Sequence, residues 1–77
     1  GLLYARRADY ERAVEVMGAA MDKAKAYNDV GYVAFKNGDL DVAESLFAEA
    51  IRLSPTYYET AQQNQKRVRL ARRVASR

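Results

Sequence analysis

Apolar side chains recur every three or four residues along the whole chain, which is the spacing of a helix that buries one face. No stretch alternates apolar and polar residues in twos, β-branched residues are few, and alanine, the best helix former, is abundant. The pattern predicts an all-α fold with helices over about 10–22, 24–37, 40–53 and 56–74, and a short piece of an earlier helix over Leu2–Arg7.

Three short segments predict where these helices begin and end. In Asn37-Gly38-Asp39, the Asn-Gly pair is suited to a left-handed turn, and the aspartate that follows is suited to cap the N-terminus of the next helix. Ser54-Pro55-Thr56 ends one helix, and Thr56 with Glu59 has the spacing of a capping box, so the next helix is expected to begin at Thr56. Ala8-Asp9-Tyr10 predicts a weaker third break, with the aspartate as its cap.

The sequence aligns with itself at an offset of 30 residues. Ala8–Ala13 and Gly38–Ala43 share one plan, which is a small residue, an aspartate, an apolar residue, two others and an alanine. Repeated helical hairpins are typical of a stacked, solenoid-like architecture. At 22–24 Asp22 is the one residue that offers a cap, so two helices either separate there or form one rod, and the repeat favours a separation.

Residues 24–57 carry a motif whose spacing holds without a gap. Its positions are Tyr27, Val30, Gly31, Ala34, Gly38, Ala43, Phe47, Ala50 and Pro55. This segment resembles a tetratricopeptide repeat, and it departs from that family at Ala34, where the motif asks for tyrosine. The resemblance implies antiparallel helical hairpins stacked as a short right-handed superhelix. It also implies that 1–23 is a partial repeat, 24–57 a complete one and 58–77 a basic capping helix.

The chain opens inside a predicted helix, because Gly1 falls at the place of a mid-helix glycine of this family. We therefore expect a fragment of a longer protein. In the longer protein the exposed ends of the repeats would pack against neighbouring repeats. The alternative is that these ends join copies of the chain into a homo-oligomer.

The composition excludes most catalytic chemistry. The chain has no histidine and no cysteine, which removes the usual general base, the disulfide and the thiolate zinc site. Asn37, Asp39 and Asp41 alternate like the opening of a calcium loop, but Val42 and Ala48 stand where that loop needs glycine and glutamate. We predict a protein that is not an enzyme and that needs no cofactor and no metal.

The charge is unevenly spread over a chain whose formal net charge is +3. Residues 66–77 hold six Lys/Arg and no acid, whereas residues 1–65 are net acidic. On a helix Lys66, Arg69 and Arg73 share one face, which suits the negative C-terminal end of a capping helix or else an acidic partner or nucleic acid. No run of 18 apolar residues and no signal peptide is visible, so we expect a soluble protein without membrane insertion, cytoplasmic or bacterial periplasmic.

The resemblance implies a function in protein–protein interaction, because the first helix of each hairpin in this family lines a concave groove that holds a peptide. The residues implied to face a partner are Lys25, Asn28, Asp29, Tyr32, Phe35, Lys36, Gln62, Gln63, Lys66 and Arg69. In an alternative interpretation, Tyr32 or Phe35 packs on an adjacent helix instead of facing a partner. Asn28 and Tyr32 replace the lysine and asparagine of the family's carboxylate clamp, so a chaperone-tail binder is not expected.

These observations predict a non-catalytic scaffold or adaptor that binds a peptide or protein surface, in a bacterial assembly or secretion system. Two alternatives stay open. One is binding of nucleic acid or an acidic partner through the basic helix 66–77, and the other is self-assembly or inter-repeat packing alone.

Overall fold

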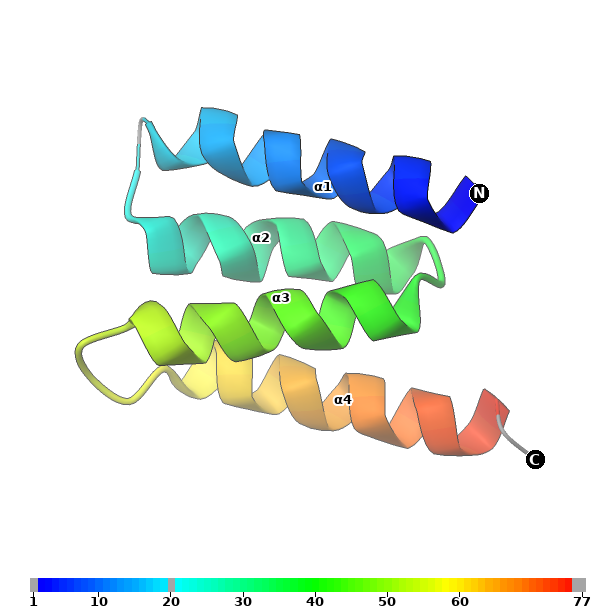
Figure 1. Cartoon of the computed structure of the whole chain (residues 1–77). Coiled ribbons are helices and arrows are strands. Elements are labelled where there is room, and N and C mark those ends of the chain that lie inside the picture. Colours follow the sequence, from blue (N-terminus) through cyan, green and yellow to red (C-terminus); the bar gives the residue numbers. More distant parts are fainter. Residues whose placement is uncertain (1, 20, 76–77) are drawn as a thin grey trace.

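In the part of the chain that the structure describes, four helices lie side by side in the order of the sequence (Figure 1). The computed structural model describes the backbone of residues 2–19 and 21–75 and, from Arg6 onward, their side chains. Successive helices run antiparallel, with α1 at one edge and α4 at the other. Their bounds are α1 Leu2–Gly18, α2 Lys23–Lys36, α3 Leu40–Leu53 and α4 Glu59–Ala75. The predicted all-α, repeat-like architecture is confirmed, while Gly1, Ala20 and Arg77 lie outside the described residues.

The hairpin of α2 and α3 is built around a close approach at Gly31. A Cβ added to Gly31 would lie 2.8 Å from Cε1 of Phe47 and 3.3 Å from Cβ of Leu46. Phe47 is fully buried, so its ring occupies the space that a side chain at position 31 would need. The small residue therefore sets how near α2 comes to α3, as its place in the motif predicts.

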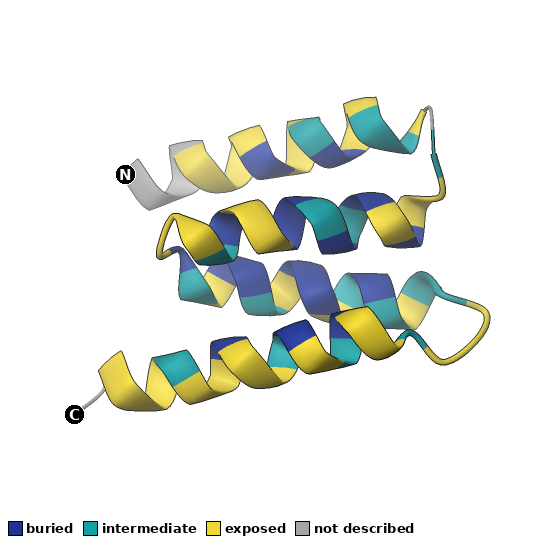
Figure 2. Ribbon diagram, turned by 180° about the vertical axis from the view of Figure 1, so that it is seen from behind, coloured by how far each residue is buried: buried dark blue, intermediate teal, exposed yellow. Residues whose placement is uncertain are grey.

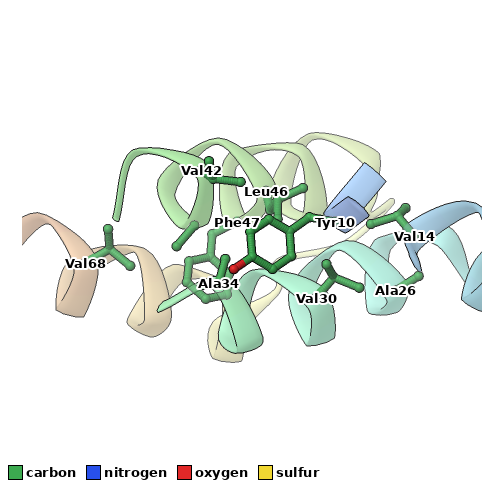
Figure 3. Close-up of a cluster of buried hydrophobic side chains, with 10 residues drawn as sticks. Tyr10, Val14, Ala26, Val30, Ala34, Val42, Leu46, Phe47 and Val68 are labelled. Atoms are coloured by element: carbon green, nitrogen blue, oxygen red, sulfur yellow. The ribbon is translucent and has the colours of Figure 1, made fainter. Parts of the chain in front are cut away.

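Side chains from all four helices meet in one hydrophobic cluster beside this contact (Figure 3). In Figure 2 buried residues occur mainly on the two central helices and on the edge of α4 that faces them, while the rest of α4 seen in this view is mostly exposed. The buried members of the cluster are Tyr10, Val14, Ala26, Val30, Ala34, Val42, Ala43, Leu46, Phe47 and Val68. The stack measures 38 × 29 × 16 Å.

The turn between α2 and α3 follows the predicted Asn37-Gly38-Asp39 signal. Gly38 has φ +83°, the left-handed region that a glycine adopts without a steric penalty. The N–H of Gly38 donates to the carbonyl of Phe35 at 3.0 Å, and the N–H of Asp39 donates to that of Ala34 at 2.9 Å. This is the Schellman pattern, which satisfies the last carbonyls of α2 and reverses the chain.

The break predicted at Ala8-Asp9-Tyr10 is wrong, because α1 runs through it without interruption and ends at Gly18. Ala8 stands where the second unit has Gly38, and alanine favours the helix over a left-handed turn. Asp9 lies 4.0 Å from Arg12 one turn on, an exposed pair within the helix rather than a cap at its start.

The start of α4 also differs from the prediction, since the helix begins at Glu59 rather than at Thr56. The hydroxyl of Ser54 donates to the carbonyl of Thr56 at 2.9 Å, which holds this segment in a turn. The first carbonyl to join the helical pattern is that of Tyr58, which accepts from the N–H of Gln62 at 3.0 Å. The predicted separation at 22–24 is confirmed, because the carboxylate of Asp22 accepts from the N–H of Ala24 at 2.8 Å at the start of α2.

Replacement of Gly31 by alanine tests the close approach. The new methyl group has no room against the fully buried Phe47, so Gly31→Ala is expected to destabilise the fold by about 1–3 kcal/mol despite the better helix propensity of alanine. Urea unfolding followed by circular dichroism measures the change.

Gly18→Ala is the matched control. A Cβ there would meet only the flexible side chain of Lys23, with its Cγ at 3.4 Å, and φ is not positive. That variant is expected to gain about 0.4–1 kcal/mol. Equal effects of the two substitutions would contradict the steric account.

Candidate interaction surface

Four side chains of α2 form one exposed surface, which we call the Tyr32 face: Lys25, Asp29, Tyr32 and Lys36. Their spacing of three or four residues places them on one side of the helix. Lys25 Nζ lies 3.1 Å from the carboxylate of Asp29, and Lys36 Nζ lies 5.6 Å from the centroid of the Tyr32 ring. The ring is 42% exposed, so an aromatic surface flanked by cations faces solvent.

Asn28 lies beneath this surface and not on it, which corrects its expected place. Its side chain is 6% exposed, and its Oδ1 accepts a hydrogen bond of 3.1 Å from Nδ2 of Asn64 on α4, which is also buried. A buried amide left without a partner costs about 1–3 kcal/mol, so the pair holds α2 and α4 in one register. Asn64 lies at the spacing of the buried Ala61 and Val68 of α4, which indicates the inner side of the helix but does not identify Asn28 as its partner.

Phe35 is half-buried and packs against the hydrophobic cluster, so it supports α2 more than it presents a surface. This agrees with the alternative in which that ring packs on an adjacent helix. Tyr32 differs, because it is no member of the cluster.

The α4 residues expected to face the same partner divide into two groups. Lys66 is exposed, as is Gln63, while Gln62 is half-buried. Arg69 instead points to α3, where its Nε donates to Glu44 at 2.9 Å, and Arg72 binds the same carboxylate and also Asp41 at 2.9 Å. Hydrogen bonds from Arg69 and then Arg72 lower the pKa of Glu44 below its ordinary value. Arg69 is therefore part of the α3–α4 contact.

The profile of the tetratricopeptide repeat family matches residues 24–57, which cover α2 from its second residue, the turn to α3, α3 itself and most of the connection to α4. This segment is a tetratricopeptide repeat. No curated protein sequence and no solved structure shows a significant match to the chain. Tetratricopeptide repeats generally mediate protein–protein interactions, and the family is generally non-catalytic.

A partly buried polar cluster, in which Tyr10 and Asp39 are buried and Arg6 and Asn37 are exposed, ties α1 to the central turn of the tetratricopeptide repeat. Tyr10 Oη donates to the carboxylate of Asp39 at 2.5 Å, Arg6 donates to the same carboxylate at 2.8 Å, and Asn37 Nδ2 donates to Tyr10 Oη at 3.0 Å. Asp39 precedes the first residue of α3, yet its side chain makes no capping hydrogen bond, so the expected capping role is wrong. Its carboxylate is used by α1 instead.

The same cluster shifts the pKa values of two of its members. The hydrogen bond from Tyr10, followed by that from Arg6, lowers the pKa of Asp39 below its ordinary value. Burial, followed by the hydrogen bond to Asp39, raises the pKa of Tyr10.

Within the described residues no group of carboxylates is arranged to hold a metal ion, and no helix there is long and apolar enough to cross a membrane. Every buried side-chain nitrogen or oxygen in that part of the chain has a hydrogen-bond partner. The polar chemistry of the repeat is therefore exposed at its surfaces or used within the fold.

The lowered pKa of Asp39 predicts a specific loss of stability in acid. The unfolded chain takes up this proton first as pH falls, so the contribution is complete above the ordinary carboxyl range, near pH 4, and is lost as pH falls toward the folded-state pKa. The free energy of unfolding is expected to fall less steeply over this range in Asp39→Asn and in Tyr10→Phe than in the natural sequence. Urea unfolding at a series of pH values measures it, and three parallel profiles would contradict the assignment.

Proposed function

We propose that the chain is a non-catalytic scaffold or adaptor module that binds a peptide or protein surface through the Tyr32 face. The exposure of Tyr32 carries the proposal. The ring lies in the C-terminal half of α2, outside the hydrophobic cluster, and the ammonium group of Lys36 lies beside it. Exposed aromatic rings supply contact area at a small cost in conformational entropy, and interfaces are enriched in them.

The charges around the ring favour one kind of partner. Lys25 and Lys36 lie on the face with one carboxylate, Asp29, which is already paired with Lys25. A segment that carries an apolar or aromatic anchor followed by an acidic residue would cover Tyr32 and pair with Lys36.

The arrangement of the repeats is part of the same proposal. Tyr10 and Val14 of α1 contact the hairpin of α2 and α3. These contacts support the assignment of α1 to a partial repeat that precedes this hairpin. Around the exposed Leu70 and Val74, the outer side of α4 carries charged and polar side chains, which supports its role as the capping helix.

The contacts of α4 favour the Tyr32 face over the basic helix as the binding site. Arg69 and Arg72 are already paired with Glu44 and Asp41, so two of the cations expected to meet phosphate are used within the fold. Binding of nucleic acid or an acidic partner remains the second candidate, and it would show a steep dependence on salt because each phosphate contact releases about one counterion.

Selection of peptides from a random display library tests the proposal and requires no partner to be chosen beforehand. Peptides selected on the natural sequence are then measured by calorimetry against Tyr32→Ala. Loss of the ring is expected to weaken binding by about 1–2 kcal/mol, roughly 5- to 30-fold, as for a typical aromatic anchor.

Tyr57→Ala is the matched control, because Tyr57 is a tyrosine that is 74% exposed in the α3–α4 connection. This variant is expected to keep full affinity. Equal affinities of the natural sequence and Tyr32→Ala would exclude the Tyr32 face. Binding lost in Lys66→Ala with Arg67→Ala and Arg73→Ala, with a steep salt dependence, would support the basic helix instead.

A further inference from the structure

A cleft opens between α1, α2 and α3 on the side of α2 away from the Tyr32 face. It encloses about 320 Å³. Tyr27 lines it, and Tyr27 and Tyr32 are five positions apart, which turns the two rings to different sides of α2. The cleft is lined by Arg7, Glu11, Val14, Glu15, Lys23, Tyr27, Ser45, Leu46 and Glu49.

The floor of the cleft is apolar, because Val14 and Leu46 are buried there and Tyr27 is half-buried beside them. Three carboxylates stand around it, from Glu11, Glu15 and Glu49, against the cations of Arg7 and Lys23.

Two of these carboxylates already have partners. Glu11 lies 3.5 Å from Arg7, and Glu49 accepts two hydrogen bonds from Arg52, at 2.6 and 2.8 Å. Glu15 has no ion pair among the described residues. The cleft therefore combines an apolar floor with an acidic group that is available to a cation.

The outer side of α4 has the complementary chemistry. Leu70 and Val74 are 60% and 65% exposed, although both are large apolar residues. Arg67 and Leu70 are three residues apart and Val74 follows one turn later, so the three share one side of the helix, with Arg73 beside them. Neither Arg67 nor Arg73 makes an ion pair within the described part of the chain, which leaves an apolar stripe flanked by cations.

We propose that the cleft binds the outer side of α4 from a second copy of this chain. Leu70 of one copy would cover the apolar floor, and its flanking arginines would meet the carboxylate of Glu15 on the other copy. This complementarity of apolar area and charge is the reason to choose a second copy as the occupant. The interface does not involve the Tyr32 face, so it stands independently of the proposed function.

The two surfaces determine the form of the assembly. The cleft belongs to α1, α2 and α3, while the docking side belongs to α4 at the far edge of the stack (Figure 1). One copy therefore offers both surfaces at once, and the contact joins two different patches. A heterologous contact of this kind adds further copies beyond a dimer, unless the copies close into a ring. The average mass is therefore expected to keep rising with concentration.

Sedimentation velocity on the whole chain measures this directly. At about 0.1 M salt the average mass is expected to rise with concentration beyond that of a dimer, and at about 1 M salt, where the Debye length falls to roughly 3 Å, the rise should weaken. A monomer at every concentration at low salt would overturn the proposal and leave the cleft for a different partner.

Two single variants separate the surfaces. Glu15→Lys reverses the charge in the cleft, and Leu70→Glu spoils the side of α4 that docks. Both positions are exposed, so both variants are expected to fold, which circular dichroism checks. Each variant alone should remain monomeric, whereas an equimolar mixture keeps one intact cleft and one intact α4 and should form dimers but nothing larger.

Asp9→Lys is the control for Glu15→Lys, because it makes the same change of charge on an exposed position of α1 that does not line the cleft. It is expected to associate like the natural sequence, as is Tyr32→Ala. Association of Glu15→Lys or Leu70→Glu by itself would overturn the proposed pairing, and so would a mixture that stays monomeric.

Discussion

The close approach of α2 and α3 at Gly31 is the contact on which the other parts of the molecule depend. The fully buried ring of Phe47 fills the space that any larger residue at position 31 would need, so the two helices have one separation. Gly38 reverses the chain between them with a positive φ that glycine adopts without a steric penalty. Because α2 and α3 are fixed relative to each other at Gly31 and at the Gly38 turn, the surfaces on which α1 and α4 pack have a defined shape.

The outer helices are attached to this hairpin by different means. On one side Tyr10 and Arg6 of α1 bind the carboxylate of Asp39 beside the turn. On the other side the amides of Asn28 and Asn64 join α2 to α4 through a buried hydrogen bond. Buried polar pairs require a specific geometry, whereas apolar contacts tolerate sliding, so these bonds set the register of the stack. The Tyr32 face and the cleft then lie on different sides of α2, and each can bind without the other.

The parts of the fold that were predictable depend on local sequence. The turn at Gly38 and the cap at Asp22 each follow from a few neighbouring residues. The tetratricopeptide repeat motif follows from the regular spacing of residues along one continuous segment, 24–57. The break at 8–10 was predicted from Asp9 as a helix cap, and it failed because Ala8 stands where the second unit has a glycine of positive φ, which alanine does not adopt without cost.

The side-chain partners were not predictable, because they are distant in sequence. Asn28 bonds a residue 36 positions away, Arg69 one 25 positions away and Tyr10 one 29 positions away. A helical wheel gives the side of a helix on which a residue lies, but not what covers it. For that reason Tyr32 was found on an exposed side as expected, whereas Asn28 was not, and the cleft formed by three helices had no signal in any one of them.

Native-state hydrogen exchange tests most directly whether the α2–α3 hairpin is the unit on which the rest depends. Regions that open only with the whole molecule keep the free energy of global unfolding, and regions attached to them open earlier. The amides around Gly31 in α2 and Phe47 in α3 are expected to exchange only through global unfolding, with those of α1 and α4 exchanging sooner. Opening of α2 or α3 while α1 and α4 stay protected would contradict this account.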